Sequence, residues 1–282
     1  MKEEKNKIVG GMLYVVATPI GNLSDISERA IKTLSEVDFI AAEDTRNTLR
    51  LLTSLGISKT LVSYHEHNKR EAGEKITERL ILGESCAIVT DAGTPAISDP
   101  GEDLVALCAQ KSIPVTSVPG ACAFVTALTL SGLPTSKFVF EGFLPVKGKE
   151  RRERLSALAK EQRTFVLHEA PHKLKNTLDD LCRELGEDRR VALCRELTKL
   201  NEQVQRCTIG EAIGYYSEHE PRGEYVIVVE GGTAVEQQGT TMSPLEAVEY
   251  YENSGMTKND AVKATAKLLG MSRNDVYKLT IS

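Results

Sequence analysis

Short apolar runs alternate with amphipathic stretches along the first half of the chain. The runs are rich in β-branched residues and almost free of polar ones, which is typical of strands buried on both faces. The stretches between them place apolar residues at helical spacing. We therefore expect strands at 12–17, 37–42, 59–63, 86–90 and 114–118, and helices at 45–54, 69–82, 102–111 and 121–130. This alternation predicts a mostly parallel sheet covered on both faces.

A further helix is expected after the first strand, where Asp25 precedes Glu28 by three residues in the pattern of a helix cap. The Gly and Pro of Ser131–Pro134 indicate a hinge, after which the alternation resumes. Strands are expected at 138–141, 164–168, 190–195, 204–208 and 225–230, with helices at 149–161 and 173–185. The chain thus reads as an N-terminal α/β domain over 1–132 and a second α/β domain over 133–232.

The C-terminal segment contains a short repeat. The stretch Gly255–Lys263 recurs as Gly270–Lys278, and each copy places Thr257 or Ser272 as a helix cap with an Asp three residues on. After the polar stretch at 231–241, the sequence Ser243-Pro-Leu-Glu246 is a strong helix start. Residues 243–282 are therefore expected to form a small subdomain resembling a helix-turn-helix.

The composition is that of a folded protein. Of 282 residues, 41% are hydrophobic and 27% charged, with a net charge of −5, which excludes wholesale disorder and a coiled coil. Aromatic residues are only 5% and Trp is absent, so a broad stacking surface for nucleic acid is not expected. No apolar stretch reaches the length of a membrane span, no signal peptide is visible, and the six cysteines are scattered. These features predict reduced thiols, no membrane partner and a cytoplasmic location.

Several familiar motifs are absent or incomplete. No GxGxxG follows a strand, and the stretch Gly142–Glu150 has one residue too many for a phosphate loop. The run His168-Glu-Ala-Pro-His172 spells HExxH, but Pro171 prevents the continuous helix that a zinc site needs. We expect a strand-to-helix turn there and no metal site.

The segments that follow the strands carry most of the candidate chemistry. In a parallel sheet the carboxyl ends of the strands meet at one rim, where ligands bind. Small and polar residues gather there, and they either make tight turns or cradle a ligand; they lie in Thr18–Asn22, Glu43–Arg46, Asp91–Pro95 and Pro119–Ala123. The second domain adds Glu169–His172, Arg195–Lys199 and Arg222–Glu224, so a cleft between the two domains is expected.

Two basic clusters stand out in an acidic chain. One follows the second domain's first strand, at Lys147–Arg154, and the other lies in the C-terminal repeat, with Lys258 and Arg273 at helix starts. Each alone is compatible with a solvated surface. Together they indicate a surface for a polyanion.

These segments together resemble a known family. The stretches LYVVATPIGN, AAEDTR, TDAGTPAISDPG, FEGFLP, HEAPHKL and RELTK are similar to the ribosomal RNA small subunit methyltransferase I family, within the tetrapyrrole methylase (class III methyltransferase) superfamily. The resemblance runs from about Met12 to the C-terminus. It implies a homodimeric enzyme that uses S-adenosylmethionine to 2′-O-methylate a cytidine in the decoding region of 16S rRNA, within the 30S subunit.

The resemblance also implies site residues. The donor would contact Pro19, Asp91, Gly93, Thr94, Ile97, Cys122, Ala123, Ala170 and Leu197. Thr94 stands where relatives have Asp, and Asp91 is the carboxylate that could substitute. A ribose hydroxyl is a weak nucleophile, so the reaction favours a base or an electrostatic helper. Candidates are Glu43 and Asp44 as base, Arg46 for a phosphate and Lys199 for the oxyanion, and RNA would meet Lys147, Lys149, Arg151, Arg152, Lys258 and Arg273.

Two other functions stay open at this point. A tetrapyrrole or other small-molecule methylase on the same fold would not need the basic helix after FLP or the helical tail. A catalytically silent RNA-binding factor would show no saturable binding of S-adenosylmethionine. For Glu43, Asp44 and Arg46, an ion-pair cluster at a helix start is an equally simple interpretation.

Overall fold

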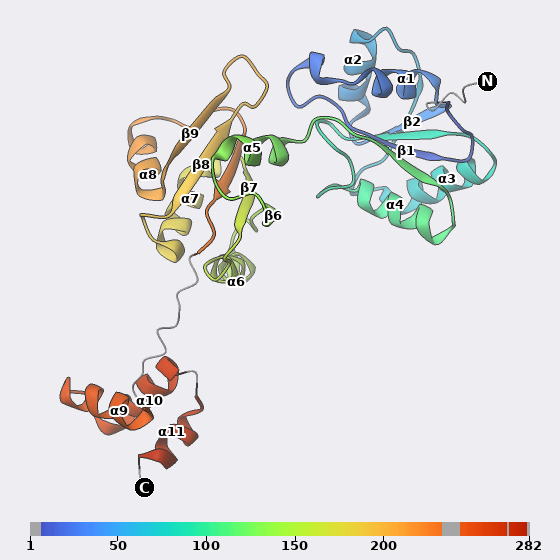
Figure 1. Ribbon diagram of the computed structural model, residues 1–282. Helices are drawn as coiled ribbons and strands as arrows, with labels where there is room; N and C mark the ends of the chain where they lie inside the picture. The colour runs from blue at the N-terminus through green and yellow to red at the C-terminus, as the bar shows by residue number, and fades with distance from the viewer. Residues whose placement is uncertain (1–6, 233–242, 270, 281–282) are drawn as a thin grey trace. The chain divides into compact units, whose positions relative to one another are not determined.

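The computed structural model describes residues 7–232, 243–269 and 271–280. The chain divides into two compact units, Met1–Gly231 and Gly232–Ser282 (Figure 1). The larger unit contains two five-stranded sheets, and the smaller one is helical. In the described part of the chain, no helix is both long and apolar enough to cross a membrane.

The first sheet is entirely parallel, in the order β3-β2-β4-β1-β5. Its strands are β1 (Leu13–Val16), β2 (Phe39–Ala42), β3 (Thr60–Ser63), β4 (Cys86–Val89) and β5 (Val115–Val118). On one face, helices α3 (Lys69–Ile81) and α4 (Gly101–Gln110) pack on the strands through Ile76 and Leu104. On the other, α1 (Glu28–Glu36) and α2 (Thr45–Ser54) do so through Leu34 and Leu52. The parallel sheet covered on both faces is confirmed.

The start of α1 differs from the expectation. Asp25 does not cap the helix: it ends a short 3₁₀ turn over Leu23–Asp25, and Ser27 is the cap residue. The Ser27 hydroxyl accepts a hydrogen bond from the Ala30 N–H at 3.1 Å. A Ser hydroxyl at the cap position satisfies a free N–H of the first turn as an Asp carboxylate would.

The second sheet is mixed, in the order β6-β7-β10-β8-β9. Its strands are β6 (Phe138–Phe143), β7 (Thr164–Glu169), β8 (Arg190–Arg195), β9 (Gln203–Thr208) and β10 (Tyr225–Val229), with only the β6–β7 pair parallel. Helices α6 (Gly148–Leu158), α7 (Pro171–Leu185) and α8 (Ile209–Glu218) cover one face. Helix α8 was not expected from the sequence pattern. It begins at a capping box formed by Thr208 and Glu211.

Helix α5 (Ala123–Ser131) lies on the opposite face of this second sheet. Ala127 and Leu128 are buried against Val166, Ala192 and Val228 of its strands. The prediction that residues 1–132 form the N-terminal domain therefore places α5 with the wrong sheet. The apolar face of α5 fits either sheet equally well in sequence, and the chain crosses to the second sheet before α5 begins.

The C-terminal unit consists of α9 (Pro244–Asn253), α10 (Lys258–Leu269) and α11 (Arg273–Leu279). Val248, Ala261, Val262 and Val276 form its own small core. Thr257 and Ser272 cap α10 and α11 as the repeat predicts, since each hydroxyl accepts from the N–H of the Asp three residues on and bonds its carboxylate.

Candidate functional site

The loops after β1, β4 and β5 are joined at one rim of the first sheet. Thr18 and Gly93 pair through two backbone hydrogen bonds, N to O, of 2.9 and 3.1 Å. The Thr94 hydroxyl donates to the Ala121 carbonyl oxygen at 3.0 Å. The prediction that these strand ends meet at one rim is confirmed for these three loops.

Glycines let the loops of the two sheets approach each other closely. A Cβ on Gly21 would lie 2.4 Å from Cγ of Lys199, which belongs to the loop after β8. A Cβ on Gly142 of β6 would lie 3.2 Å from the Ser98 hydroxyl, in the loop after β4. Both glycines have positive φ, so any other residue would be strained as well as crowded. The site is therefore built from both sheets.

Two adjoining cavities lie at this junction. Cavity A has a volume of about 220 Å³ and is lined by residues of the first sheet's loops together with β6 and β7: Ile20, Glu43, Thr90, Ala92, Gly93, Thr94, Ile97, Ser98, Asp99, Cys122, Ala123, Phe124, Phe140, Gly142, Phe143 and His168. Cavity B has a volume of about 450 Å³ and is lined mainly by the second domain: Ile20, Ala92, Ala123, Phe143, His168, Glu169, Ala170, Pro171, His172, Cys194, Leu197, Lys199, Glu224, Tyr225 and Val226. The residues that line both cavities form the boundary between them: Ile20, Ala92, Ala123, Phe143 and His168.

Most of the residues predicted to bind the donor line these cavities. Gly93, Thr94, Ile97, Cys122 and Ala123 line cavity A. Ala123, Ala170 and Leu197 line cavity B. Pro19 and Asp91 stand outside both linings, although Ile20 and Ala92 beside them are included. The Asp91 carboxylate instead accepts a hydrogen bond from the Asn47 side-chain amide at 3.1 Å.

Unusual backbone conformations are concentrated in the two cavity loops. Ala96 and Ser98, after β4, have φ of 65° and 62°. Glu196 and Thr198, after β8, have φ of 50° and 66°. For residues with a Cβ this region costs about 1–3 kcal/mol each and is held where a site needs it. In the loop after β4, Asp99 helps hold the turn by accepting from the N–H groups of Ala96 and Gly101.

Lys199 presents a fixed positive charge at cavity B. Its ammonium nitrogen lies 3.0 Å from a Glu196 carboxylate oxygen and 2.7 Å from one of Glu224. Burial lowers the pKa of Lys199, but the hydrogen bonds that its ammonium donates to Glu224 and Glu196 outweigh this effect, so the pKa is raised. The side chain is therefore a cation at neutral pH and is suited to stabilise negative charge.

The three candidates after β2 do not share one position. Glu43 lines cavity A and accepts a hydrogen bond of 2.8 Å from the Thr90 hydroxyl. Asp44 instead caps α2, and Arg46 forms a two-pronged pair with it, at 3.0 and 2.6 Å. That pair holds the pKa of Asp44 far below its usual range. The Arg46 side chain is 83% exposed, so the structure places Asp44 and Arg46 on the surface outside both cavity linings.

His168 occupies the wall common to both cavities. Its ring contacts those of Phe140 and Phe143, with centroids 5.5 Å apart in each case. Burial lowers its pKa, against an opposing effect of the Glu224 charge, so the imidazole is neutral at neutral pH. Its Nε2 is buried and has no hydrogen-bond partner among the described residues. In the sequence His168 stood out only as part of the HExxH run and Phe143 only as part of the FEGFLP stretch, and neither was expected to line the site, although both stand at strand ends.

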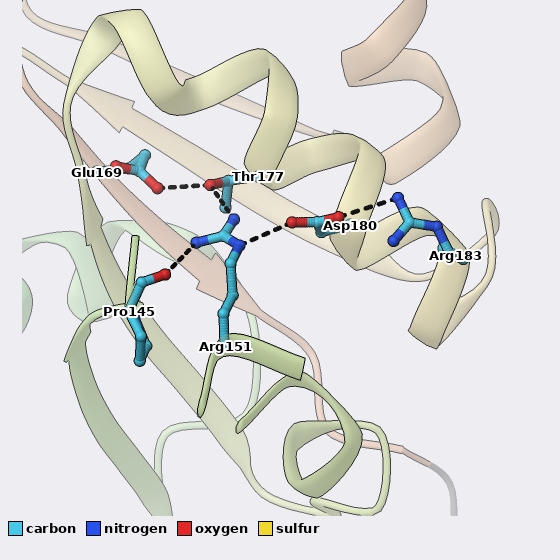
Figure 2. A network of polar contacts seen from close by, with 6 residues as sticks. All are labelled: Pro145, Arg151, Glu169, Thr177, Asp180 and Arg183. Carbon is cyan, nitrogen blue, oxygen red and sulfur yellow. Dashed lines mark hydrogen bonds and ion pairs between the residues drawn. The ribbon is translucent and has the colours of Figure 1, made fainter. Parts of the chain in front are cut away.

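Glu169 is a buried carboxylate at the wall of cavity B, with 5% of the residue exposed. Figure 2 shows its contacts: it accepts a hydrogen bond of 2.5 Å from the Thr177 hydroxyl, which in turn accepts one of 3.0 Å from Arg151. The preceding strand ends at Glu169 and α7 begins at Pro171, so the predicted strand-to-helix turn is confirmed. Among the described residues there is no group of three or more His, Cys, Asp or Glu able to hold a metal.

The basic residues proposed for RNA have different surroundings. Lys147, Lys149 and Arg152 are exposed at the start of α6, as are Lys258 and Arg273 in the C-terminal unit. The Arg151 side chain is only 12% exposed. It bonds Asp180, Thr177 and the Pro145 carbonyl oxygen at 2.8–3.0 Å (Figure 2). Arg151 thus joins the loop after β6 to α7.

Comparisons with known proteins show the family of the chain. The family model of tetrapyrrole (corrin/porphyrin) methylases matches residues 12–213. A ribosomal RNA small subunit methyltransferase I from Synechocystis is 44% identical over 96% of this chain and 98% of its own length. Those of Halalkalibacterium halodurans and Bacillus subtilis are 47% and 46% identical, over 95% of this chain and 94% and 93% of theirs.

Solved structures support the fold. A cobalt-precorrin-4 methyltransferase of cobalamin biosynthesis aligns with a TM-score of 0.59 at 16% identity, over 78% of this chain and 95% of that one. A diphthine synthase aligns with a TM-score of 0.60 at 14% identity, over 79% and 90%. The uroporphyrin-III C-methyltransferase of Thermus thermophilus complexed with S-adenosylhomocysteine aligns with a TM-score of 0.54 at 18% identity, over 78% and 96%. At these identities the likeness concerns the fold alone.

Proposed function

The chain belongs to the ribosomal RNA small subunit methyltransferase I family of the tetrapyrrole methylases, and from this premise we propose that it methylates the 2′-oxygen of a cytidine in 16S rRNA with S-adenosylmethionine as donor. The observation that carries the proposal is the pair of joined cavities at the rim where the loops of both sheets meet. Their linings hold most of the residues that the family resemblance assigns to the donor.

The cavity residues fit such a donor. Cavity B, at about 450 Å³, falls in the range of small-molecule sites, and the adjoining cavity A adds about 220 Å³. Gly93, Ala92 and Ala123 let a flat group approach the backbone, while Ile20 and Leu197 offer apolar surface. The Nε2 of His168 has no hydrogen-bond partner among the described residues, so a ligand at the boundary of the cavities would supply one. A neutral imidazole there also avoids repelling a sulfonium cation.

When bound, S-adenosylmethionine supplies an activated methyl group on a positively charged sulfur. The chain's own contribution is to orient the ribose hydroxyl, exclude water and handle one proton. Glu43 is positioned by Thr90 at the wall of cavity A and is the candidate to accept that proton. Lys199, held by two carboxylates in cavity B, stabilises the developing oxyanion.

The nucleic acid would lie along the basic residues outside the cavities. Lys147, Lys149 and Arg152 at the start of α6, and Lys258 and Arg273 in the C-terminal unit, are exposed cations able to contact phosphates. Arg46 joins them as an exposed guanidinium at the first sheet's rim. For Arg151 we propose a different role, because its donors already hold Pro145, Thr177 and Asp180.

Labelled methyl transfer to isolated 30S subunits, compared with free 16S rRNA and followed by nucleoside mapping, tests the proposal. We expect one 2′-O-methylated cytidine in the decoding region. Methyl transfer to a tetrapyrrole and none to RNA would favour the small-molecule alternative. Absence of any S-adenosylmethionine binding in calorimetry would favour a silent RNA-binding factor.

Two further expectations follow from the same family. The enzyme would work in the cytoplasm, where its ribosomal substrate is assembled. It would also be a homodimer, which light scattering on the full chain measures. A monomer at micromolar concentration would remove the dimer from the proposal and leave the cavities as described.

A further inference from the structure

A third, more open depression lies between α6 and α7, outside cavities A and B. Its volume is about 440 Å³, and it is lined by Val146, Lys147, Arg151, Lys173, Asn176, Thr177, Asp179, Asp180 and Arg183. We call it the α6–α7 groove. On the proposal that the chain modifies RNA, we propose that this groove binds backbone phosphates of the RNA substrate beside the methyl-transfer site.

The charges of the groove favour an anion. Four of its lining residues are cations and two are carboxylates. Asp180 is already paired with Arg151 at 2.8 Å and with Arg183 at 2.9 Å, which leaves it little capacity to bind another cation. Lys147 and Lys173 form no ion pair within the described part of the chain, and their charges are available to a ligand.

The positions of these two lysines, at the starts of two helices, would favour a bound anion. Lys147 stands directly before α6, and no side chain caps the free N–H groups of that helix. Lys173 lies in the first turn of α7. A helix N-terminus carries a partial positive charge, so a lysine there is disfavoured unless an anion binds close by. A phosphate in the groove would be attracted by both lysines and both helix ends.

The floor of the groove is held by a network of hydrogen bonds that reaches cavity B. Arg151 bonds the Pro145 carbonyl oxygen, Thr177 and Asp180, which fixes the loop before α6 against α7. Thr177 then donates to Glu169, a wall residue of cavity B (Figure 2). Pro171 and His172 line cavity B, whereas the next residue, Lys173, lines the groove. One helix start therefore separates the two sites.

This adjacency gives the groove a specific role. An RNA strand whose phosphates lie in the groove would bring a nearby nucleotide toward cavity B, because the groove residue Lys173 directly follows Pro171 and His172 of that cavity's lining. The groove would set which nucleotide reaches the donor. It acts on binding and register rather than on the methyl transfer itself.

The test uses the full-length double variant K147A/K173A. Its matched control is K160A/K175A, which removes two lysines from the same region outside the groove; Lys175 pairs with Glu220 at 2.7 Å. Binding to a 16S rRNA fragment is measured at several salt concentrations. We expect at least a tenfold weaker affinity for K147A/K173A and a salt slope smaller by about 1 to 2, since about 0.7 to 1 is lost per phosphate contact. The control should match the wild type.

Two further measurements separate this inference from the proposed function. Calorimetric binding of S-adenosylmethionine should be the same in all three proteins, and the double variant should raise KM for RNA with little change in kcat. If the wild type fails to methylate 30S subunits while the double variant still loses RNA affinity, the proposed function fails and the groove stands. If K147A/K173A has the same RNA affinity and salt slope as the control, the proposal that the groove binds RNA phosphates is overturned.

A final arm distinguishes RNA phosphate from a small anion. Titration with inorganic phosphate should give no saturable heat below millimolar concentration, because one free ion contacts only part of the groove. Submillimolar binding of phosphate that is lost in K147A/K173A, with RNA affinity unchanged, would identify a small-anion site and contradict the proposal.

Discussion

The ammonium nitrogen of Lys199 lies 2.7 Å from a carboxylate oxygen of Glu224 at the wall of cavity B. Glu196 holds the same nitrogen from a second direction at 3.0 Å. A lysine fixed in this way keeps its charge aimed at one place without reorganising during a reaction. On the proposed function, the two glutamates would be positioning residues for a cation that faces the RNA.

Replacing Lys199 should affect catalysis more than donor binding. We predict that K199A lowers kcat by about 100-fold, the range found when one preorganised donor is removed from an oxyanion site. Single-turnover methylation and calorimetric donor binding measure the two effects separately. The matched variant E224Q keeps the cation and should lose much less. Wild-type kcat in K199A would remove Lys199 from the mechanism.

Donor binding should weaken in acid because of His168. Burial puts its pKa below the ordinary value of about 6.5, so it takes up a proton only below that pH. A cation at the cavity boundary would repel a sulfonium. We predict that the Kd of S-adenosylmethionine rises as the pH falls below about 6.5, and that the Kd of S-adenosylhomocysteine, which lacks the sulfonium charge, rises less. H168Q should abolish this difference, and equal pH dependence of the two ligands in the wild type would contradict it.

The lowered pKa of His168 also makes the stability of the fold depend on pH. The unfolded chain binds a proton on this histidine at a higher pH than the folded chain does. The free energy of unfolding should therefore decrease as the pH falls below about 6.5, and H168Q should reduce that decrease. Urea unfolding at a series of pH values measures it. A free energy of unfolding of the wild type that rises on acidification through this range would contradict the prediction.

Gly93 should be required for donor binding. Its φ is 85°, and a Cβ there would lie 3.3 Å from Ile20 Cγ2 at the cavity wall. G93A should raise the Kd of S-adenosylmethionine about tenfold, equivalent to about 1.4 kcal/mol. The control is G83A. Gly83 has a φ of 98°, and a Cβ there would have no atom within 4 Å, so this variant introduces backbone strain without a steric contact. Equal donor affinity in G93A and the wild type would contradict the close approach at this loop.

Arg151 should matter for stability more than its exposed neighbour does. Replacing it with Met leaves the Pro145 carbonyl oxygen and Thr177 without its hydrogen bonds. We predict that R151M lowers the free energy of unfolding by about 1–3 kcal/mol and that R152M changes it by less than about 0.5 kcal/mol. Urea denaturation of the two variants measures this. Equal stabilities would show that the network in Figure 2 contributes nothing to folding.

The rim was predictable because strand polarity determines it. Thr94 and Ala121 follow different strands, yet parallel strands end on one side, and the two residues are hydrogen-bonded. The strand-to-helix turn before α7 was predictable because Pro171 disfavours a helical conformation of the residue before it, so a helix can begin at Pro171 but not run through it from the N-terminal side. In both cases the local sequence carries the information.

Other features depend on residues distant in the chain. Arg151 is one of several arginines in a basic stretch, and its burial follows from a partner 29 residues away, Asp180. The positive φ of Ala96 and Ser98 has no signal in residue type, since neither is Gly, Asn or Asp. The position of α5 on the second sheet likewise comes from tertiary packing, which the helical pattern of 123–131 does not encode.

The most direct test of the account is calorimetric titration of the full-length protein with S-adenosylmethionine. The joined cavities predict saturable binding of one donor per chain, which the cavity-filling variant A123F abolishes while the fold is retained in circular dichroism. Ala123 lines both cavities, so this one change blocks their junction. Unaltered donor affinity in folded A123F, or no binding by the wild type at millimolar concentration, would contradict the central claim.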